Sequence, residues 1–175
     1  MTQPLTPDDG NFEQTAELLG IKKPYLPHKI DLGIAYQAPK RMVRRVFLMA
    51  TGTLDPGYDD ISVIRADHMG TFGFRDVGVH VYVNNDGEIQ WGRSLERAPE
   101  YPKTAEESDI VILIHGHENS MEMAALNTLR ALLPVINAVH NNGLHFEGLT
   151  KHHARLGIDR WGKLVEPALQ APPEN

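Results

Sequence analysis

The chain has 175 residues, a net charge of -6, 41% hydrophobic and 23% charged residues, and no cysteine. This length and composition are ordinary for a globular protein with one main domain. The absence of cysteine excludes disulfides, thiolate metal ligands and a cysteine nucleophile. No stretch approaches the roughly 20 apolar residues of a membrane-spanning helix, and the N-terminus does not have the layout of a signal peptide.

The first forty residues differ from the rest of the sequence. They are rich in proline, and they contain one short helical pattern at 12–19 and no strong strand pattern. We therefore expect an N-terminal arm or extension over 1–40, which packs on the domain or docks a partner. The main domain is expected over 41–170 and a short tail over 171–175.

The next signals are those of a strand, a loop and a helix. A continuous apolar run at 46–50 predicts a central buried strand. Residues 51–60 contain glycine and proline and are expected to form a loop. Asp59 or Asp60 can cap a following helix, which is expected to end near Gly70.

A β-hairpin is predicted next. Its first strand has the period-2 pattern in which one face differs from the other. A tight turn is expected at Asn85-Asp86-Gly87, where the Asp86-Gly87 pair supplies the positive backbone dihedrals of a two-residue hairpin turn. The alternating residues are Val79, Val81 and Val83 on one face and His80, Tyr82 and Asn84 on the other.

The remaining elements complete an α/β pattern. A polar loop at 94–108 precedes a buried strand at 110–114, and the longest helix is expected to open at Ser120. A loop with short structure follows at 149–161, and a terminal helix is expected at 161–169. This order predicts an α/β fold with a mixed central β-sheet flanked by helices.

The segment from Phe74 to Arg93 resembles the zinc N-acetylmuramoyl-L-alanine amidases, a family that includes phage lysozyme-amidases and peptidoglycan recognition proteins. In that family the floor of the active groove is formed by a similar segment. It consists of a run with aspartate, glycine, tyrosine and histidine, then a strand, an aspartate-glycine turn, a second strand and glycine-arginine. The order of elements agrees from about residue 44 to residue 166. The resemblance implies an amidase-like, peptidoglycan-recognition-protein-like fold.

Two positions that carry the family's chemistry are changed here. The family holds a catalytic zinc with two histidines and a third ligand, and a tyrosine stabilises charge on the carbonyl oxygen. The first ligand position corresponds to Met49, whose neutral thioether is a poor zinc ligand. The tyrosine position corresponds to Val79, which has no hydroxyl. No catalytic residue is therefore assigned, and Met49 and Val79 are read as degenerate positions.

Other positions of the resemblance are retained. His80 and Arg93 match the histidine and arginine of the hairpin segment, and Tyr101 stands where the family has a further histidine. Lys151-His152-His153 resembles the family's paired histidines, and the Asp159-Arg160-Trp161 stretch follows it. The candidate groove or ligand-binding residues are His80, Arg93, Tyr101, His152 and His153. His152 is a weak candidate metal ligand, and His68 is read as structural.

Two further patterns offer alternatives. His115 and His117 flank a glycine after the buried strand, and such a pair can chelate a relocated metal ion. The run from Lys40 to Arg45 is the only dense basic cluster, and its ordinary interpretation is a solvated strand approach. Nucleic acid is not expected as a partner of a chain with this net charge.

The resemblance supports two functional hypotheses. In the first, the protein is a catalytically inactive pseudo-amidase of phage origin that has no cofactor. It then serves as a protein-binding or structural module, or as a peptidoglycan-binding module. In the second, it is an active peptidoglycan amidase, an endolysin, with a rearranged zinc site, so its status as an enzyme stays open. The expected partners are a phage structural protein, a polymerase-like target or a peptidoglycan fragment, and no membrane. The expected location is the cytoplasm of an infected bacterium or the virion, as a virion component or a regulator.

Overall fold

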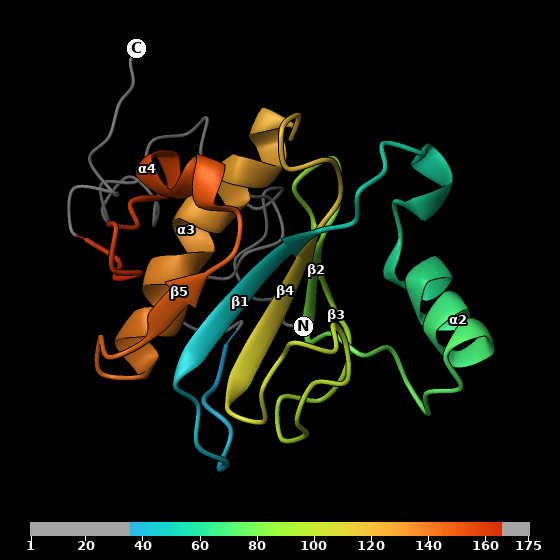
Figure 1. The fold of residues 1–175 in the computed structure, drawn as a ribbon, viewed down its shortest axis with the longest axis horizontal. Helices are drawn as coiled ribbons and strands as arrows, with labels where there is room; N and C mark the ends of the chain where they lie inside the picture. Colours follow the sequence, from blue (N-terminus) through green and yellow to red (C-terminus); the bar gives the residue numbers. More distant parts are fainter. Residues whose placement is uncertain (1–35, 166–175) are drawn as a thin grey trace, which may run out of the picture.

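A five-stranded mixed β-sheet in the strand order β3-β2-β4-β1-β5 forms the centre of the protein (Figure 1). The computed structural model describes residues 36–165. This architecture confirms the predicted α/β class with a mixed central sheet. The elements in chain order are β1 (Arg45–Ala50), the 3-10 helix η3 (Pro56–Tyr58), α2 (Ile61–Thr71), β2 (Val81–Val83), β3 (Ile89–Trp91), β4 (Asp109–Ile114), α3 (Met123–Val139), β5 (His145–Glu147), the 3-10 helix η4 (Thr150–His152) and α4 (His153–Leu156).

Four of the five strands run in the same direction. β4 pairs in parallel with β1 on one side and with β2 on the other, and β5 pairs in parallel with β1. The edge strand β3 alone is antiparallel to its neighbour, β2. Both predicted apolar runs are therefore inner strands, and every residue of β4 is buried. In β1, by contrast, Phe47 and Met49 are only half-buried, because one face of this strand is incompletely covered.

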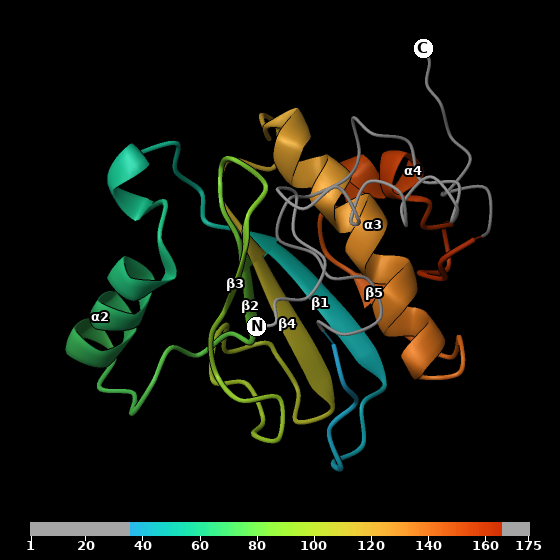
Figure 2. The same ribbon diagram turned by 180° about the vertical axis from the view of Figure 1, so that it is seen from behind.

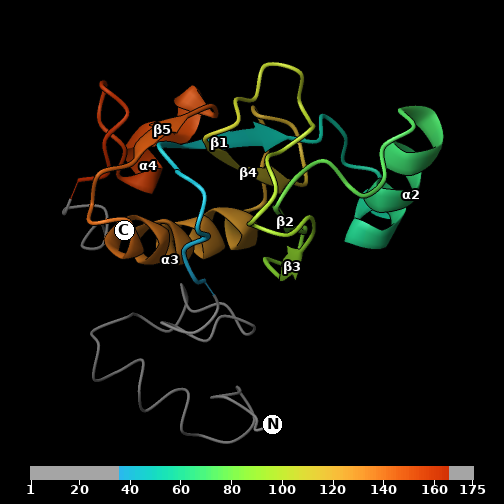
Figure 3. The ribbon, with the colours of Figure 1, turned by 90° about the horizontal axis from the view of Figure 1, so that it is seen from below.

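The helices lie on different sides of the sheet. α3 covers one face, and its apolar side forms the main core with the strands (Figures 1 and 3). α2 lies on the opposite side of β2 and β3 from α3, as the view from behind also shows (Figure 2). Its Ile61 and Ile64 join a second, smaller cluster that includes Val79, Val111 and Leu113. The Asp60 side chain caps α2 by accepting a hydrogen bond from the Ser62 N–H, as predicted.

The hairpin turns at Asn85-Asp86-Gly87, as predicted, but it does not form a two-residue turn. Val83 pairs with Ile89, and the Asn84 N–H donates to the Glu88 carbonyl at 3.0 Å. The connection is therefore a three-residue loop over 85–87, in which Gly87 has a φ of +84° and no other residue has a positive φ. A turn followed by a glycine in the left-handed region is the usual form of such a loop. The Thr128 hydroxyl of α3 donates to the Gly87 carbonyl at 2.6 Å, which fixes the loop to the main core.

Three other boundaries also differ from the predictions. α3 begins at Met123 rather than Ser120, because the Ser120 N–H closes a turn by donating to the His117 carbonyl at 2.9 Å. The short strand β5 was not predicted, since it consists of one apolar residue between two polar ones. Residues 161–165 do not form a helix, because Leu164 pairs with Ile158 in an isolated bridge. The remainder of that predicted helix, 166–169, lies outside the described residues.

The described part of the predicted arm is attached to the core. Tyr36 is 2% exposed and its hydroxyl lies 2.6 Å from Nε2 of His140 at the end of α3. The helical pattern at 12–19 and the predicted tail at 171–175 lie outside the described residues. Within residues 36–165, no helix is long and apolar enough to cross a membrane.

Candidate functional site

A cavity of about 400 Å³ opens between the sheet and α2, at the carboxyl end of β1. Such a volume lies within the range of small-molecule sites, and the carboxyl ends of parallel strands are their usual place in α/β folds. The wall combines hydroxyl, aromatic, aliphatic and carboxylate groups. The lining residues are Thr51, Thr53, Tyr58, Ile64, Asp67, His68, Tyr101 and Leu113.

His68 presents a hydrogen-bond donor to this cavity. Its Nδ1 accepts a hydrogen bond from the Gly78 N–H at 2.9 Å, so in the neutral ring the proton resides on Nε2. Burial lowers the pKa of His68, with a smaller opposing effect from Asp67 and a further lowering by Arg93. No described residue accepts a hydrogen bond from Nε2. The neutral imidazole of this lining residue therefore has an N–H that no described residue bonds.

Tyr101 is the one predicted groove residue that lines the cavity. Its ring centroid lies 4.6 Å from that of His68 and 5.6 Å from that of Phe72, in a group of packed rings. The loop that carries Tyr101 approaches closely because Gly78 has no side chain: an added Cβ would lie 2.6 Å from the Tyr101 Cβ. Tyr101 thus lies where the predicted contact with a ligand is sterically possible.

Arg93 supports this loop from inside the protein. It is 4% exposed, and its guanidinium donates to the carbonyls of Val77 and Ala98 and to the carboxylate of Glu100, the last at 2.6 Å. These bonds join the approach to the hairpin to the segment before Tyr101. All the bonds of Arg93 are internal, so the structure gives it a role in shaping the wall of the cavity.

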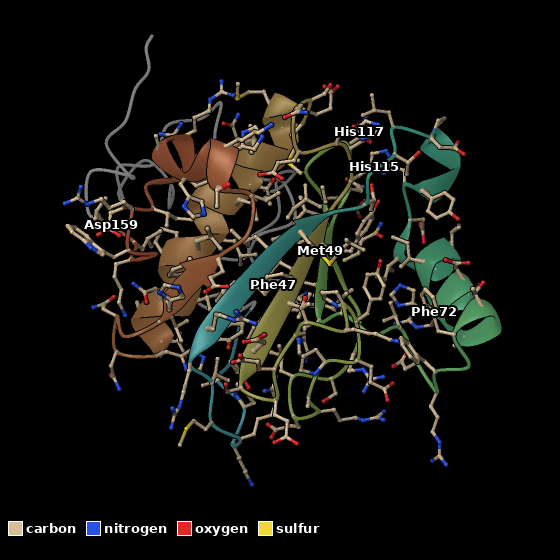
Figure 4. All side chains as sticks on the ribbon, in the orientation of Figure 1. Phe47, Met49, Phe72, His115, His117 and Asp159 are labelled. Carbon is tan, nitrogen blue, oxygen red and sulfur yellow. The ribbon has the colours of Figure 1, made fainter. Side chains whose placement is uncertain are left out.

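Met49 and Val79 lie on the same side of the sheet as the cavity. Met49 is half-buried at the margin of the second cluster, and Val79 is fully buried within it. Figure 4 shows Met49 with Phe47 on the same strand, near the centre of the sheet. Both residues that the resemblance compares with a zinc ligand and a tyrosine of the amidases thus have apolar side chains in or beside this cluster.

His80 is completely buried, and both of its ring nitrogens are engaged. Nδ1 accepts from the Val111 N–H at 3.1 Å, so Nε2 carries the proton and donates to the Arg97 carbonyl at 2.8 Å. Burial lowers the pKa of His80 to about 4, and the charges of Arg41 and Arg93 act in the same direction. His80 therefore joins three segments of backbone and has no exposed surface for a ligand.

His152 and His153 lie in η4 and α4. His152 is 8% exposed, its Nε2 contacts the Glu118 carbonyl, and its Nδ1 has no hydrogen-bond partner among the described residues. Nε2 of His153 donates to the carbonyl of Gly148 at 2.7 Å. Neither histidine lines the cavity, which separates them from Tyr101 and His68.

His115 and His117 do not belong to any group of three metal-ligand side chains within residues 36–165. His115 is buried, with Nδ1 3.0 Å from the Tyr82 hydroxyl and 3.6 Å from the Asp59 carboxylate. His117 is exposed in the turn before α3, and both histidines follow the end of β4 (Figure 4). Asp159, from the stretch after the paired histidines, lies on the opposite side of the molecule in the same view.

In the basic cluster from Lys40 to Arg45, the guanidinium groups of Arg41 and Arg45 form hydrogen bonds within the protein. Arg41 donates to the carbonyls of Leu95 and Glu107 and also to that of Asp109. Arg45 forms a two-pronged ion pair with the fully buried Asp109 carboxylate, at 2.8 and 2.5 Å. These contacts agree with the interpretation of the run as a strand approach and leave few free cations for phosphate groups.

The part of the chain that the structure describes does not offer a set of ligands that fits a zinc ion. A catalytic zinc requires three protein ligands, and residues 36–165 contain no group of three histidine, cysteine, aspartate or glutamate side chains placed to hold a metal. Met49 offers only a thioether, and His152 is bonded to a carbonyl away from the cavity.

The fold is that of peptidoglycan recognition proteins and amidase-like proteins. The chain is similar to Drosophila peptidoglycan recognition protein SD, with 19% identity and a TM-score of 0.51, over 67% of this chain and 75% of that one. It is similar to the Ph2119 endolysin of the Thermus scotoductus MAT2119 bacteriophage, with 18% identity and a TM-score of 0.52, over 66% and 77%. It is also similar to the peptidoglycan recognition protein LCa and LCx ectodomain complex, a structure with bound tracheal cytotoxin, with 18% identity and a TM-score of 0.53, over 69% and 81%. No protein-family model and no curated protein sequence matches the chain.

Most residues of the cavity wall were not predicted from the sequence. His68 was read as structural, and its Gly78 bond confirms part of that reading, but the ring also reaches the cavity. Thr51 and Thr53 follow closely after Met49, which the resemblance compares with the family's first ligand, and this was the available signal for this wall. Asp67 had no signal beyond its place beside His68.

Proposed function

We propose that the protein binds peptidoglycan fragments in the cavity beside α2 and does not catalyse zinc-dependent amide hydrolysis. One observation supports this proposal above the others. The cavity opens where β1 ends, yet this strand carries Met49 at the ligand position and the cavity side of the sheet is apolar at Val79. The protein thus has a cavity where the resemblance leads us to expect the amidase groove. The side chains at Met49 and Val79, however, are unable to bind a zinc ion or assist its chemistry.

The wall of the cavity suits a sugar-peptide. The hydroxyls of Thr53, Tyr58 and Tyr101 and the N–H of His68 can bond to hydroxyl and amide groups, while Ile64 and Leu113 contact apolar parts. Binding of this kind needs shape and hydrogen bonds and does not require a metal. The solved structures with this fold include peptidoglycan recognition proteins, one of them with bound tracheal cytotoxin.

Origin and location follow from the same resemblance. The proposal places the protein in a phage or prophage, in the infected cell or the virion, where it serves as a virion component or a regulator. A protein partner for the arm over 1–40 is part of this proposal. An endolysin of a bacteriophage is among the solved structures with this fold, which agrees with such an origin.

The binding half of the proposal is tested with soluble muramyl peptides and isothermal titration calorimetry on the full chain. Thr53→Trp places a large ring at the cavity wall and is expected to weaken binding at least about tenfold by steric exclusion. Thr150→Trp is the matched control, because Thr150 is exposed in η4 and does not line the cavity. Equal affinity of both variants would move the site elsewhere, and no binding by the wild type would refute it.

The catalytic half is tested with purified cell walls in buffer with added zinc. The expected result is no release of stem peptide above a protein-free control. Zinc-dependent release at a rate proportional to protein concentration would establish the alternative, an active amidase with a rearranged site.

A further inference from the structure

The described wall of the cavity carries a negative formal charge. Among the described lining residues, Asp67 alone has a formal charge, and no described lysine or arginine lines the wall. One Asp67 oxygen, Oδ1, accepts a hydrogen bond from the Thr71 hydroxyl at 2.8 Å, and no described residue forms an ion pair with this carboxylate. Asp67 thus lines the space that a ligand would fill, with a half-buried carboxylate that no described lysine or arginine pairs with.

The arginines around α2 are already paired. Arg65, on the same helix, donates to the Asp76 carboxylate at 2.7 Å. Arg93, whose charge affects His68, is buried and bonded to Glu100 at 2.6 Å. Arg75 and Lys103 are exposed in neighbouring loops and do not line the cavity. The negative charge of Asp67 is therefore not matched by a cation of the wall.

Two other features of the wall also favour a cation. Asp67 and His68 lie in the last turns of α2, which ends at Thr71, and the carbonyl end of a helix carries partial negative charge. Tyr101 and Tyr58 line the same cavity, and aromatic rings attract an ammonium group. A carboxylate at this end of a ligand would meet repulsion from Asp67 and from the helix end.

We infer that the cavity selects a ligand with a free ammonium group, which Asp67 binds as an ion pair. This inference rests on the proposed function and specifies it: the fragment is one whose stem peptide carries a free side-chain amine. The hydroxyls of the wall and Nε2–H of His68 then bond to the amides and sugar of the same fragment. A fragment in which the amine is capped loses the ion pair and keeps the other contacts.

The experiment compares two probes that differ only in this charge. The first is a muramyl tripeptide that ends in lysine, and the second is the same compound acetylated on the lysine side chain. Each is titrated by calorimetry into the full-length wild type and into Asp67→Asn. Asparagine keeps an oxygen for the Thr71 hydroxyl, so the melting temperature is expected to stay close to that of the wild type.

The free-amine probe is expected to bind the wild type about tenfold more tightly than the acetylated probe. Asp67→Asn should remove this difference by weakening only the free-amine probe, as a double-mutant cycle requires for a direct interaction. Glu107→Gln, which removes an exposed carboxylate outside the cavity, is the matched control and should leave both affinities unchanged.

The outcomes separate the inference from the proposed function. Equal wild-type affinities for the two probes overturn the role of the ammonium group, while the binding of peptidoglycan fragments stands. Equal losses of both probes in Asp67→Asn assign the residue to the shape of the wall and also overturn the inference. Absence of binding by either probe refutes the proposed function and the inference together.

Discussion

The imidazole of His68 accepts a hydrogen bond at Nδ1 from the backbone N–H of Gly78, at a distance of 2.9 Å. This bond connects the end of α2 to the segment that enters the hairpin. The same contact determines which ring nitrogen carries the proton, and so Nε2 is the donor of a ring that lines the cavity. One residue thereby serves the packing of the helix and the chemistry of the wall.

These two roles of His68 can be separated by substitution. His68→Ala leaves the Gly78 N–H without an acceptor and removes a buried ring, so it should cost about 2–4 kcal/mol of unfolding free energy. His68→Asn keeps an acceptor near the Nδ1 position and should cost less, yet lose the donor at Nε2 and bind ligand as weakly as the alanine variant. Urea denaturation and calorimetry measure the two effects. Wild-type affinity in both variants would contradict the assigned donor.

The buried His80 gives stability a defined pH dependence. Its pKa is lowered from 6.5 to about 4, so between these values the unfolded state binds a proton that the folded state does not. The contribution of the neutral His80 to the free energy of unfolding is therefore fully present above pH 6.5. It decreases as the pH is lowered toward 4, by on the order of 3 kcal/mol. The lowered pKa values of His68 and His140 act in the same direction.

Urea denaturation at half-unit steps from pH 7 to pH 4 measures this dependence. In His80→Gln one titrating group is absent, so the slope of the unfolding free energy should decrease by up to about 1.4 kcal/mol per pH unit in the middle of this range. Parallel curves for the wild type and His80→Gln would show that another group is responsible.

The sequence predicted the inner sheet and α2 because their signals are local. The apolar runs of β1 and β4 are long enough to be read alone, and Asp60 marks the start of α2 through its own side chain. β5 offers no such signal, because His145 and Glu147 are polar and the strand exists through its pairing with β1. The start of α3 likewise depends on a turn that the spacing of apolar residues does not reveal.

The candidate site was predicted less completely for a related reason. The resemblance indicated which positions border a groove, and Tyr101 does line the cavity. It could not indicate how many hydrogen bonds a side chain makes inside the protein, which decides the environment of His80 and Arg93. The position of Asp67 on the wall depends on the packing of α2 against the sheet, so residue type alone does not identify it.

Replacing Gly148, which follows β5 at its junction with β1, is predicted to destabilise the protein strongly. Its φ is +89°, and an added Cβ would lie 1.8 Å from the carbonyl oxygen of Leu48. Gly52 has a similar φ of +83° with nothing within 4 Å, so it serves as the matched control. Gly52→Ala should cost about 1 kcal/mol from backbone strain alone, whereas Gly148→Ala should cost several times more or prevent folding. Equal melting temperatures for the two variants would contradict this account of the junction.

Restoring a tyrosine at position 79 is expected to destabilise the protein. Val79 is 0% exposed within the second cluster, so Val79→Tyr inserts a ring into packed space and should cost about 1–3 kcal/mol or more. Val79→Ile adds one methylene group at the same place and should be tolerated far better. Thermal unfolding of both variants provides the comparison. A Val79→Tyr variant as stable as the wild type would mean that the cavity can accept the ring.

Zinc content provides the most direct test of the proposal that the protein does not hold a catalytic zinc ion. Elemental analysis of the tag-free protein is expected to give zinc well below one ion per chain, because residues 36–165 contain no group of three suitable ligands. His152→Ala should not change this value, since Nε2 of His152 is bonded to the Glu118 carbonyl. Met49→His adds a single imidazole and should remain substoichiometric as well. Near-stoichiometric zinc that disappears in His152→Ala would instead demonstrate a rebuilt metal site, and with it the active-amidase alternative.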